Sequence, residues 1–144
     1  AGEEAIDALL ERLSARLGAE RVYRIAPQAD HRPECATRHA PLFGRHAPAS
    51  VSADAQPRPQ RPLWLLDPPE ALAEIDGGPW RHGRLQLLAG PERIESGWWD
   101  GGETSGRGDV RRDYFIALAA DARWLWIYRE CRAPGGWFLH GVFG

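Results

Sequence analysis

The feature that most constrains the fold of this chain is the distribution of its tryptophan and glycine residues. All seven tryptophans and 13 of the 16 glycines lie in residues 63–144. In that region short apolar runs alternate with turn-forming glycine and proline pairs, and no helical period separates them. Strands that follow one another without a crossover helix pair mostly antiparallel. This part of the chain is therefore predicted to be an antiparallel β domain.

One predicted strand indicates the shape of that domain. Trp124, Trp126 and Tyr128 share one face of this strand, and Leu125 and Ile127 share the other. Apolar side chains on both faces favour a sheet that is covered on both sides. We therefore expect a mainly β fold whose C-terminal end is a small antiparallel curled sheet or barrel.

The first 26 residues predict one helix followed by one strand. Gly18 is a natural stop for the helix, and residues 21–25 form a short β-prone run. A helix and a single strand do not close a hydrophobic core, so residues 1–26 are interpreted as the end of a larger domain. The helix is indicated by apolar residues that recur on one helical face: Ile6, Leu9, Leu10, Leu13 and Leu17.

A disordered linker rich in proline and arginine is predicted at residues 27–61. The stretch from Pro27 to Pro62 holds seven of the twelve prolines and shows no hydrophobic period. Such a segment does not bury enough apolar area to offset the entropy lost on ordering. The β domain is then expected to cover residues 62–144.

Charge and composition limit the classes of function. All 18 basic residues are arginine, the net charge is −2, and the chain contains no methionine. An acidic balance argues against a strongly basic nucleic-acid footprint over the whole chain, and the lack of methionine indicates a fragment of a longer protein. No apolar run approaches the roughly 20 residues that span a bilayer. Two widely separated cysteines favour free thiols and a cytoplasmic location.

The sequence offers no catalytic constellation. It has no glycine-rich phosphate loop, no nucleophile elbow and no acidic pair suited to two-metal chemistry. His31, Cys35 and His39 are spaced by four residues and would share one face of a helix. Pro33 and Pro41 oppose a helix there. We therefore predict no catalytic residues, no cofactor and no metal site.

Aromatic and arginine side chains interleave in the β domain, and two interpretations of them remain open. Exposed rings could stack on the bases of single-stranded DNA, at roughly 1–3 kcal/mol per base. The same rings could instead fill the core of a small domain, which the balance of nine arginines against twelve acids in residues 63–144 favours. The residues that could form an interaction surface are Arg93, Trp98, Trp99, Arg111, Arg112, Tyr114, Arg129 and Trp137.

Two short segments are candidates for a tether to the bacterial sliding clamp. Polymerases attach to this clamp through Leu-Phe or Leu-Trp anchors that follow a polar residue. The first candidate comprises His39, Pro41, Leu42 and Phe43, and it has histidine where glutamine is typical. The second candidate comprises Gln60, Leu63 and Trp64; it has the glutamine, but its Leu-Trp pair opens a predicted strand and is expected to lie inside the fold.

Four sequence elements of the β domain form a specific combination. They are Arg61-Pro62-Leu63-Trp64-Leu65-Leu66-Asp67-Pro68-Pro69-Glu70, Gly90-Pro91-Glu92-Arg93-Ile94-Glu95 with Trp98-Trp99, Arg111-Arg112-Asp113-Tyr114, and residues 137–141. Together they resemble the C-terminal region of the ImuB family, polymerase-like subunits of bacterial translesion mutasomes. The combination is more specific than any one of the elements.

This resemblance implies a role in DNA damage tolerance without catalysis. Residues 8–34 would correspond to the last helix and strand of the little-finger domain of a Y-family polymerase-like protein. Proteins of this family act as adaptors in translesion synthesis and SOS mutagenesis. The expected partners are the sliding clamp, a RecA-like protein of the ImuA type and an error-prone C-family DNA polymerase. DNA would be contacted directly or through the complex, and no membrane is involved.

Overall fold

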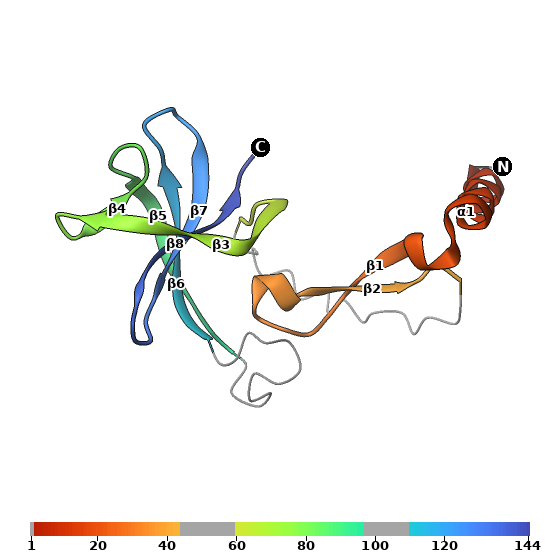
Figure 1. Ribbon diagram of the computed structural model, residues 1–144, viewed down its shortest axis with the longest axis horizontal. Coiled ribbons are helices and arrows are strands. Elements are labelled where there is room, and N and C mark those ends of the chain that lie inside the picture. The colour runs from red at the N-terminus through yellow and green to blue at the C-terminus, as the bar shows by residue number, and fades with distance from the viewer. Residues whose placement is uncertain (1, 44–59, 97–109) are drawn as a thin grey trace. The chain divides into compact units, whose positions relative to one another are not determined.

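The computed structural model of the chain describes residues 2–43, 60–96 and 110–144 (Figure 1). The chain forms two compact units, Ala1–Asp54 and Ala55–Gly144. Among the described residues, no helix combines the length and the apolar character that crossing a bilayer requires.

The first unit contains the predicted helix and strand together with a second strand. Gly18 ends α1 as predicted: its φ is 96° and its amide donates to the Ser14 carbonyl over 3.0 Å. Tyr23 and His39 stack across the hairpin of the two strands, with ring centroids 3.6 Å apart. The elements are α1 (Gly2–Leu17), η1 (Ala19–Arg21), β1 (Tyr23–Pro27), η2 (Pro33–Cys35) and β2 (Thr37–Pro41).

The structure differs from the predicted linker where β2 pairs antiparallel with β1. The prolines that suggested disorder occupy positions where a missing amide proton costs little. Pro33 begins η2, and Pro41 is the last residue of β2. The remainder of the predicted linker, residues 44–59, lies outside the described residues.

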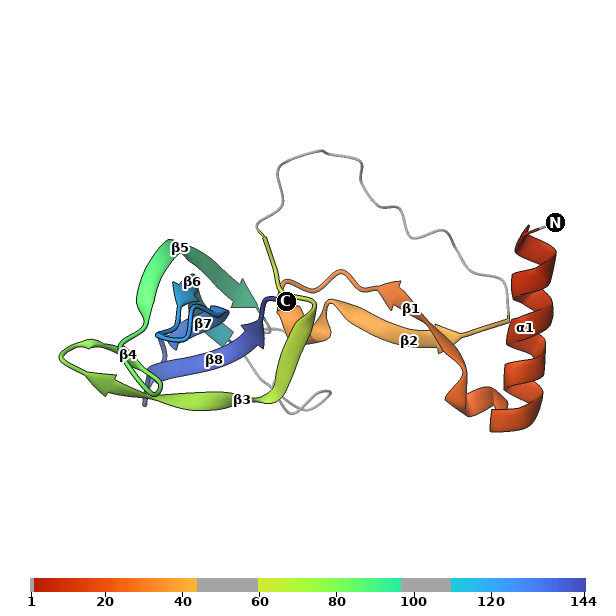
Figure 2. The same cartoon turned by 90° about the horizontal axis from the view of Figure 1, so that it is seen from above.

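The second unit is a single six-stranded antiparallel sheet in the order β4-β3-β8-β7-β6-β5. Figure 2 shows β5 arching away from β3 as the sheet curls between them. The predicted mainly β fold with a curled antiparallel sheet is therefore confirmed. The strands are β3 (Trp64–Ile75), β4 (Gly78–Trp80), β5 (Gln86–Ser96), β6 (Val110–Leu118), β7 (Trp124–Glu130) and β8 (Gly136–Val142).

Two of the proline sites that suggested turns between short apolar runs lie inside strands instead. β3 continues through Pro68 and Pro69, and β5 continues through Pro91. The register shifts between Leu65 and Glu70 in β3, and on either side of Ala89 in β5. A bulge removes local ladder hydrogen bonds, so a residue without an amide proton is tolerated there.

Both faces of β7 are buried over Leu125–Tyr128, as the alternation along this strand predicted. Leu125 and Ile127 belong to one core cluster with Ala117 and Leu139. Trp126 and Tyr128, on the opposite face, belong to a second cluster with Ile94 and Tyr114. Gly141 lies beside this second cluster and lets the start of β3 approach closely, because a Cβ atom there would come within 2.9 Å of the Trp64 carbonyl oxygen.

A matched pair of substitutions on β7 tests this arrangement. Trp126 is 2% exposed, whereas Trp124 on the same face is 47% exposed. We expect Trp126→Ala to lower the free energy of unfolding by about 3–5 kcal/mol, because it removes a buried aromatic ring and leaves a cavity. Trp124→Ala should cost less than half as much. Urea denaturation followed by far-UV circular dichroism measures both. Equal losses would contradict the assigned burial.

Candidate functional site

Most arginines of the predicted interaction surface form ion pairs with acidic residues of a neighbouring strand. The Arg93 guanidinium donates two hydrogen bonds to the Asp113 carboxylate, at 2.7 and 2.9 Å. Arg111 Nε donates to Glu95 Oε1 over 2.8 Å, two register positions further along the same strand pair. These arginines therefore have carboxylate partners within the domain, which neutralise much of their charge toward an outside ligand.

Arg112 belongs to a buried polar cluster on the opposite face. Its guanidinium lies 4.7 Å from the centre of the Tyr128 ring and 3.5 Å from the Glu130 carboxylate. It also donates to the Tyr114 hydroxyl over 3.3 Å. That hydroxyl is joined to His140 Nδ1 by a hydrogen bond of 2.8 Å, and both of these residues are only 1% exposed. The cluster thus ties β6, β7 and β8 together and offers little surface to a ligand.

Arg129 has a different environment from the other candidate arginines. Its register partner Asp113 is already held by Arg93. Within the part of the chain that the structure describes, Arg129 makes no ion pair, and its guanidinium lies 5.9 Å from the centre of the Trp137 ring. Trp137 is 6% exposed, so it supports Arg129 from within the core.

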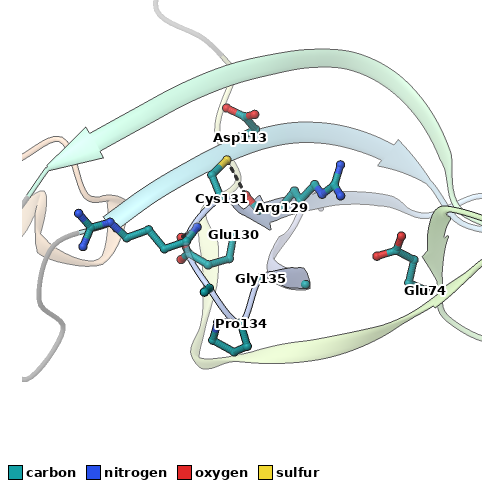
Figure 3. A pocket seen from close by; sticks show the side chains of 10 residues that line it. Glu74, Asp113, Arg129, Glu130, Cys131, Pro134 and Gly135 are labelled. Atoms are coloured by element: carbon teal, nitrogen blue, oxygen red, sulfur yellow. Dashed lines mark hydrogen bonds between the residues drawn. The ribbon is translucent and has the colours of Figure 1, made fainter.

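A cavity of about 500 Å³ opens beside Arg129, at the turn between β7 and β8 (Figure 3). Arg129 and Glu130 come from the end of β7, Asp113 from β6 and Glu74 from β3. The turn residues 131–135 and Gly136, the first residue of β8, form the rest of the wall. The cavity is thus a polar recess with groups of both charge signs.

Two pKa shifts at this recess have opposite directions. The Arg93 guanidinium lowers the pKa of Asp113 by hydrogen bonding to its carboxylate. The stability that this pair contributes is therefore present above the ordinary aspartate pKa and is lost as the pH falls through the lowered value. Burial raises the pKa of the Cys131 thiol, and the nearby Asp113 carboxylate raises that pKa further. The thiolate form of Cys131 is therefore less favoured than that of an ordinary cysteine.

The structure brings only part of the predicted interaction surface together. Arg93, Arg129 and Trp137 lie in neighbouring positions of one register row. Arg112 and Tyr114 are buried on the other face, and residues 98 and 99, the adjacent tryptophans, lie outside the described residues. Sequence reasoning missed Glu74, Asp113 and Glu130 as parts of the site. The sequence shows that these acidic residues alternate with arginines. Only the register between the strands shows which acid lies beside which arginine.

The two clamp-binding candidates differ from each other in their setting. Phe43 is 55% exposed just after β2, and Leu42 beside it is half-buried. In the first candidate, Pro41 and His39 belong to the paired strand β2.

The second candidate is more exposed than expected. Leu63 is 97% exposed and Trp64 75% exposed, so the expectation that they lie inside the fold is wrong. Gln60 is exposed as well. Arg61, which follows it, is anchored by Glu92 at 2.6 Å and by the ring of Trp126. The backbone of Trp64 enters β3 as predicted while its side chain points away from the core.

No group of three or more potential metal ligands occurs among residues 2–43, 60–96 and 110–144. His39, one of the three spaced residues considered above, instead stacks on Tyr23.

Comparison with known proteins finds two curated relatives from strains of Caulobacter vibrioides, NA1000 / CB15N and ATCC 19089 / CIP 103742 / CB 15. Both are called Protein ImuB, and each is 34% identical to this chain over 160 residues. The alignment covers 99% of this chain and 34% of each relative, so the chain spans about a third of their length. The resemblance to ImuB seen in the sequence motifs is thereby confirmed. No family model and no solved structure matches the chain.

The environment of Cys131 predicts how its alkylation depends on pH. In a Cys35→Ser background, only Cys131 reacts with iodoacetamide. We expect Asp113→Asn to shift the pH dependence of the alkylation rate to lower pH, because it removes the carboxylate that disfavours the thiolate. Glu95→Gln, which alters the neighbouring ion pair, is the control and should leave the profile in place. An unchanged profile in Asp113→Asn would contradict the assigned cause.

Proposed function

We propose that this chain is a non-catalytic adaptor module of a complex for DNA damage tolerance, acting in translesion synthesis and induced mutagenesis in the cytoplasm. The observation that carries the proposal is the 34% identity to Protein ImuB over 99% of the chain. Because the chain spans only about a third of those relatives, the module would act as one part of a larger assembly. Its contacts would be with the sliding clamp, a RecA-like protein of the ImuA type and an error-prone C-family polymerase.

The distribution of exposed side chains supports protein partners. Phe43, Leu63 and Trp64 are large apolar residues that are more than half exposed. Aromatic anchors of this kind contribute most of the binding energy in many protein interfaces. They would gain from a pocket on a partner, because water solvates them in the free chain.

The alternative function, a direct single-stranded DNA binder, has less support. It needs exposed rings on which bases stack, but Tyr114, Trp126 and Trp137 are at most 6% exposed. It also needs free positive charge, whereas Arg93 and Arg111 are paired with acids. Binding of DNA would quench tryptophan fluorescence and weaken as salt rises, so a titration at two salt concentrations distinguishes the two functions.

The central experiment is capture of the two protein partners by the whole chain. Immobilised residues 1–144 should retain the purified RecA-like partner, the error-prone polymerase, or both. A denatured sample of the same chain serves as the control for non-specific capture. If the folded chain, checked by circular dichroism, retains neither protein at micromolar concentration, the adaptor role is wrong.

The first clamp-binding candidate gives a separate prediction. Burial of Leu42 and Phe43 in a pocket on the clamp would contribute about 1.5–3 kcal/mol each, offset in part by ordering of the peptide. We therefore expect micromolar affinity for the clamp. Replacing both residues with alanine should abolish this binding and leave the melting temperature unchanged. Surface plasmon resonance on immobilised clamp measures the affinity.

The second candidate supplies the matched control. Leu63→Ala with Trp64→Ala removes a Leu-aromatic pair of similar size, and the high exposure of both residues predicts little loss of stability. Clamp affinity should stay the same in this variant. The opposite pattern, with binding lost only when Leu63 and Trp64 are replaced, would identify the second segment as the tether.

A further inference from the structure

The inference concerns Arg129 and the recess beside it, and it rests on the adaptor role proposed above. Arg93, Arg111 and Arg112, the other candidate arginines of the sheet, each have a carboxylate partner. Among the described residues, Arg129 has none. Its guanidinium lies 5.9 Å from the centre of the Trp137 ring, a contact that leaves the N–H donors available to a ligand.

The recess is suited to a protein ligand that carries a carboxylate. Figure 3 shows the Arg129 side chain extending from β7 toward the side of the cavity on which Glu74 stands. The acids at the opposite end of the recess are already paired, Asp113 with Arg93 and Glu130 with Arg112. Glu74 makes no ion pair within the described part of the chain. A ligand would therefore place an acceptor on Arg129 and a donor near Glu74.

We propose that this recess docks an extended, mixed-charge segment of a protein partner, with an Asp or Glu side chain of that segment bound bidentately by Arg129. Guanidinium and carboxylate match in geometry and charge, and such pairs are strong when one partner is already oriented. A basic or amide group of the same segment would face Glu74. The site lies on the β domain, away in sequence from both clamp-binding candidates, so it would serve the RecA-like protein or the polymerase.

Nucleic acid is a poorer occupant of the same recess. Three acids, Glu74, Asp113 and Glu130, line it against two arginines, Arg129 and Arg132. A chain of phosphates would meet this excess of negative charge along its length. A peptide carries single acidic groups at intervals and can place one on Arg129 without placing another on Glu74.

The test compares charge reversal at Arg129 with the same change at the other end of β7. The variant is Arg129→Glu, and the matched control is Arg123→Glu, where the wild-type arginine is 56% exposed and outside the recess. Whole chains are measured by biolayer interferometry against the purified clamp, RecA-like partner and polymerase. Circular dichroism and the melting temperature verify that each variant is folded.

We expect Arg129→Glu to weaken binding to the RecA-like partner or the polymerase by about tenfold or more, the size of a lost charge-assisted hydrogen bond. Arg129→Lys should show a smaller loss, because it keeps the charge without the bidentate geometry. Arg123→Glu should change affinity by less than about twofold, the effect of a rim charge. Clamp affinity should be the same in all variants, since neither clamp-binding candidate includes Arg123 or Arg129.

The outcomes separate this proposal from the adaptor role. If the wild-type chain binds the partners and Arg129→Glu binds them as well as Arg123→Glu does, the docking site is wrong and the adaptor role stands. If the wild-type chain binds none of the three proteins, both are wrong. If Arg129→Glu instead removes binding of a labelled 20-nucleotide DNA strand while protein affinity persists, the recess is a nucleic-acid contact and the proposal is overturned.

Discussion

Burial of both faces of β7 is the constraint on which the rest of the domain depends. Leu125 and Ile127 pack into an apolar cluster on one face of β7, and Trp126 and Tyr128 pack into a second cluster on the opposite face. A flat sheet with one solvent-exposed face would leave the large aromatic rings in water. Curling the six strands covers both faces, and the bulges in β3 and β5 allow the outer strands to bend.

The polar groups of the domain follow from this packing. Aromatic side chains shield the buried charged and hydroxyl groups from water. These groups therefore form hydrogen bonds and ion pairs with side chains of neighbouring strands. Tyr114 and His140 satisfy each other, and Arg112 bridges them to Glu130. At the rim, Arg93 pairs with Asp113. The arginines that interleave with aromatic residues in the β domain are thus largely used for pairing within the domain.

The sites that remain for partners lie where internal pairing ends. Leu63 and Trp64 are presented at the start of β3 by the anchored Arg61, and Phe43 follows the last paired residue of β2. Arg129 faces a recess at the turn between β7 and β8, at the opposite end of β7 from the turn that follows β6. These segments are distant from one another in sequence, and several separate contacts would suit the adaptor role proposed above.

The sequence by itself determined the class of the fold, because strand alternation, glycine turns and the two apolar faces of β7 are local patterns. It also determined the helix and its stop at Gly18, and the ImuB-like motifs. Tertiary structure decided which strands continue through proline, since a bulge depends on the partner strand. It also decided that Trp64 is exposed and that Arg129 lacks an acid, because burial and ion pairing depend on register between strands distant in sequence.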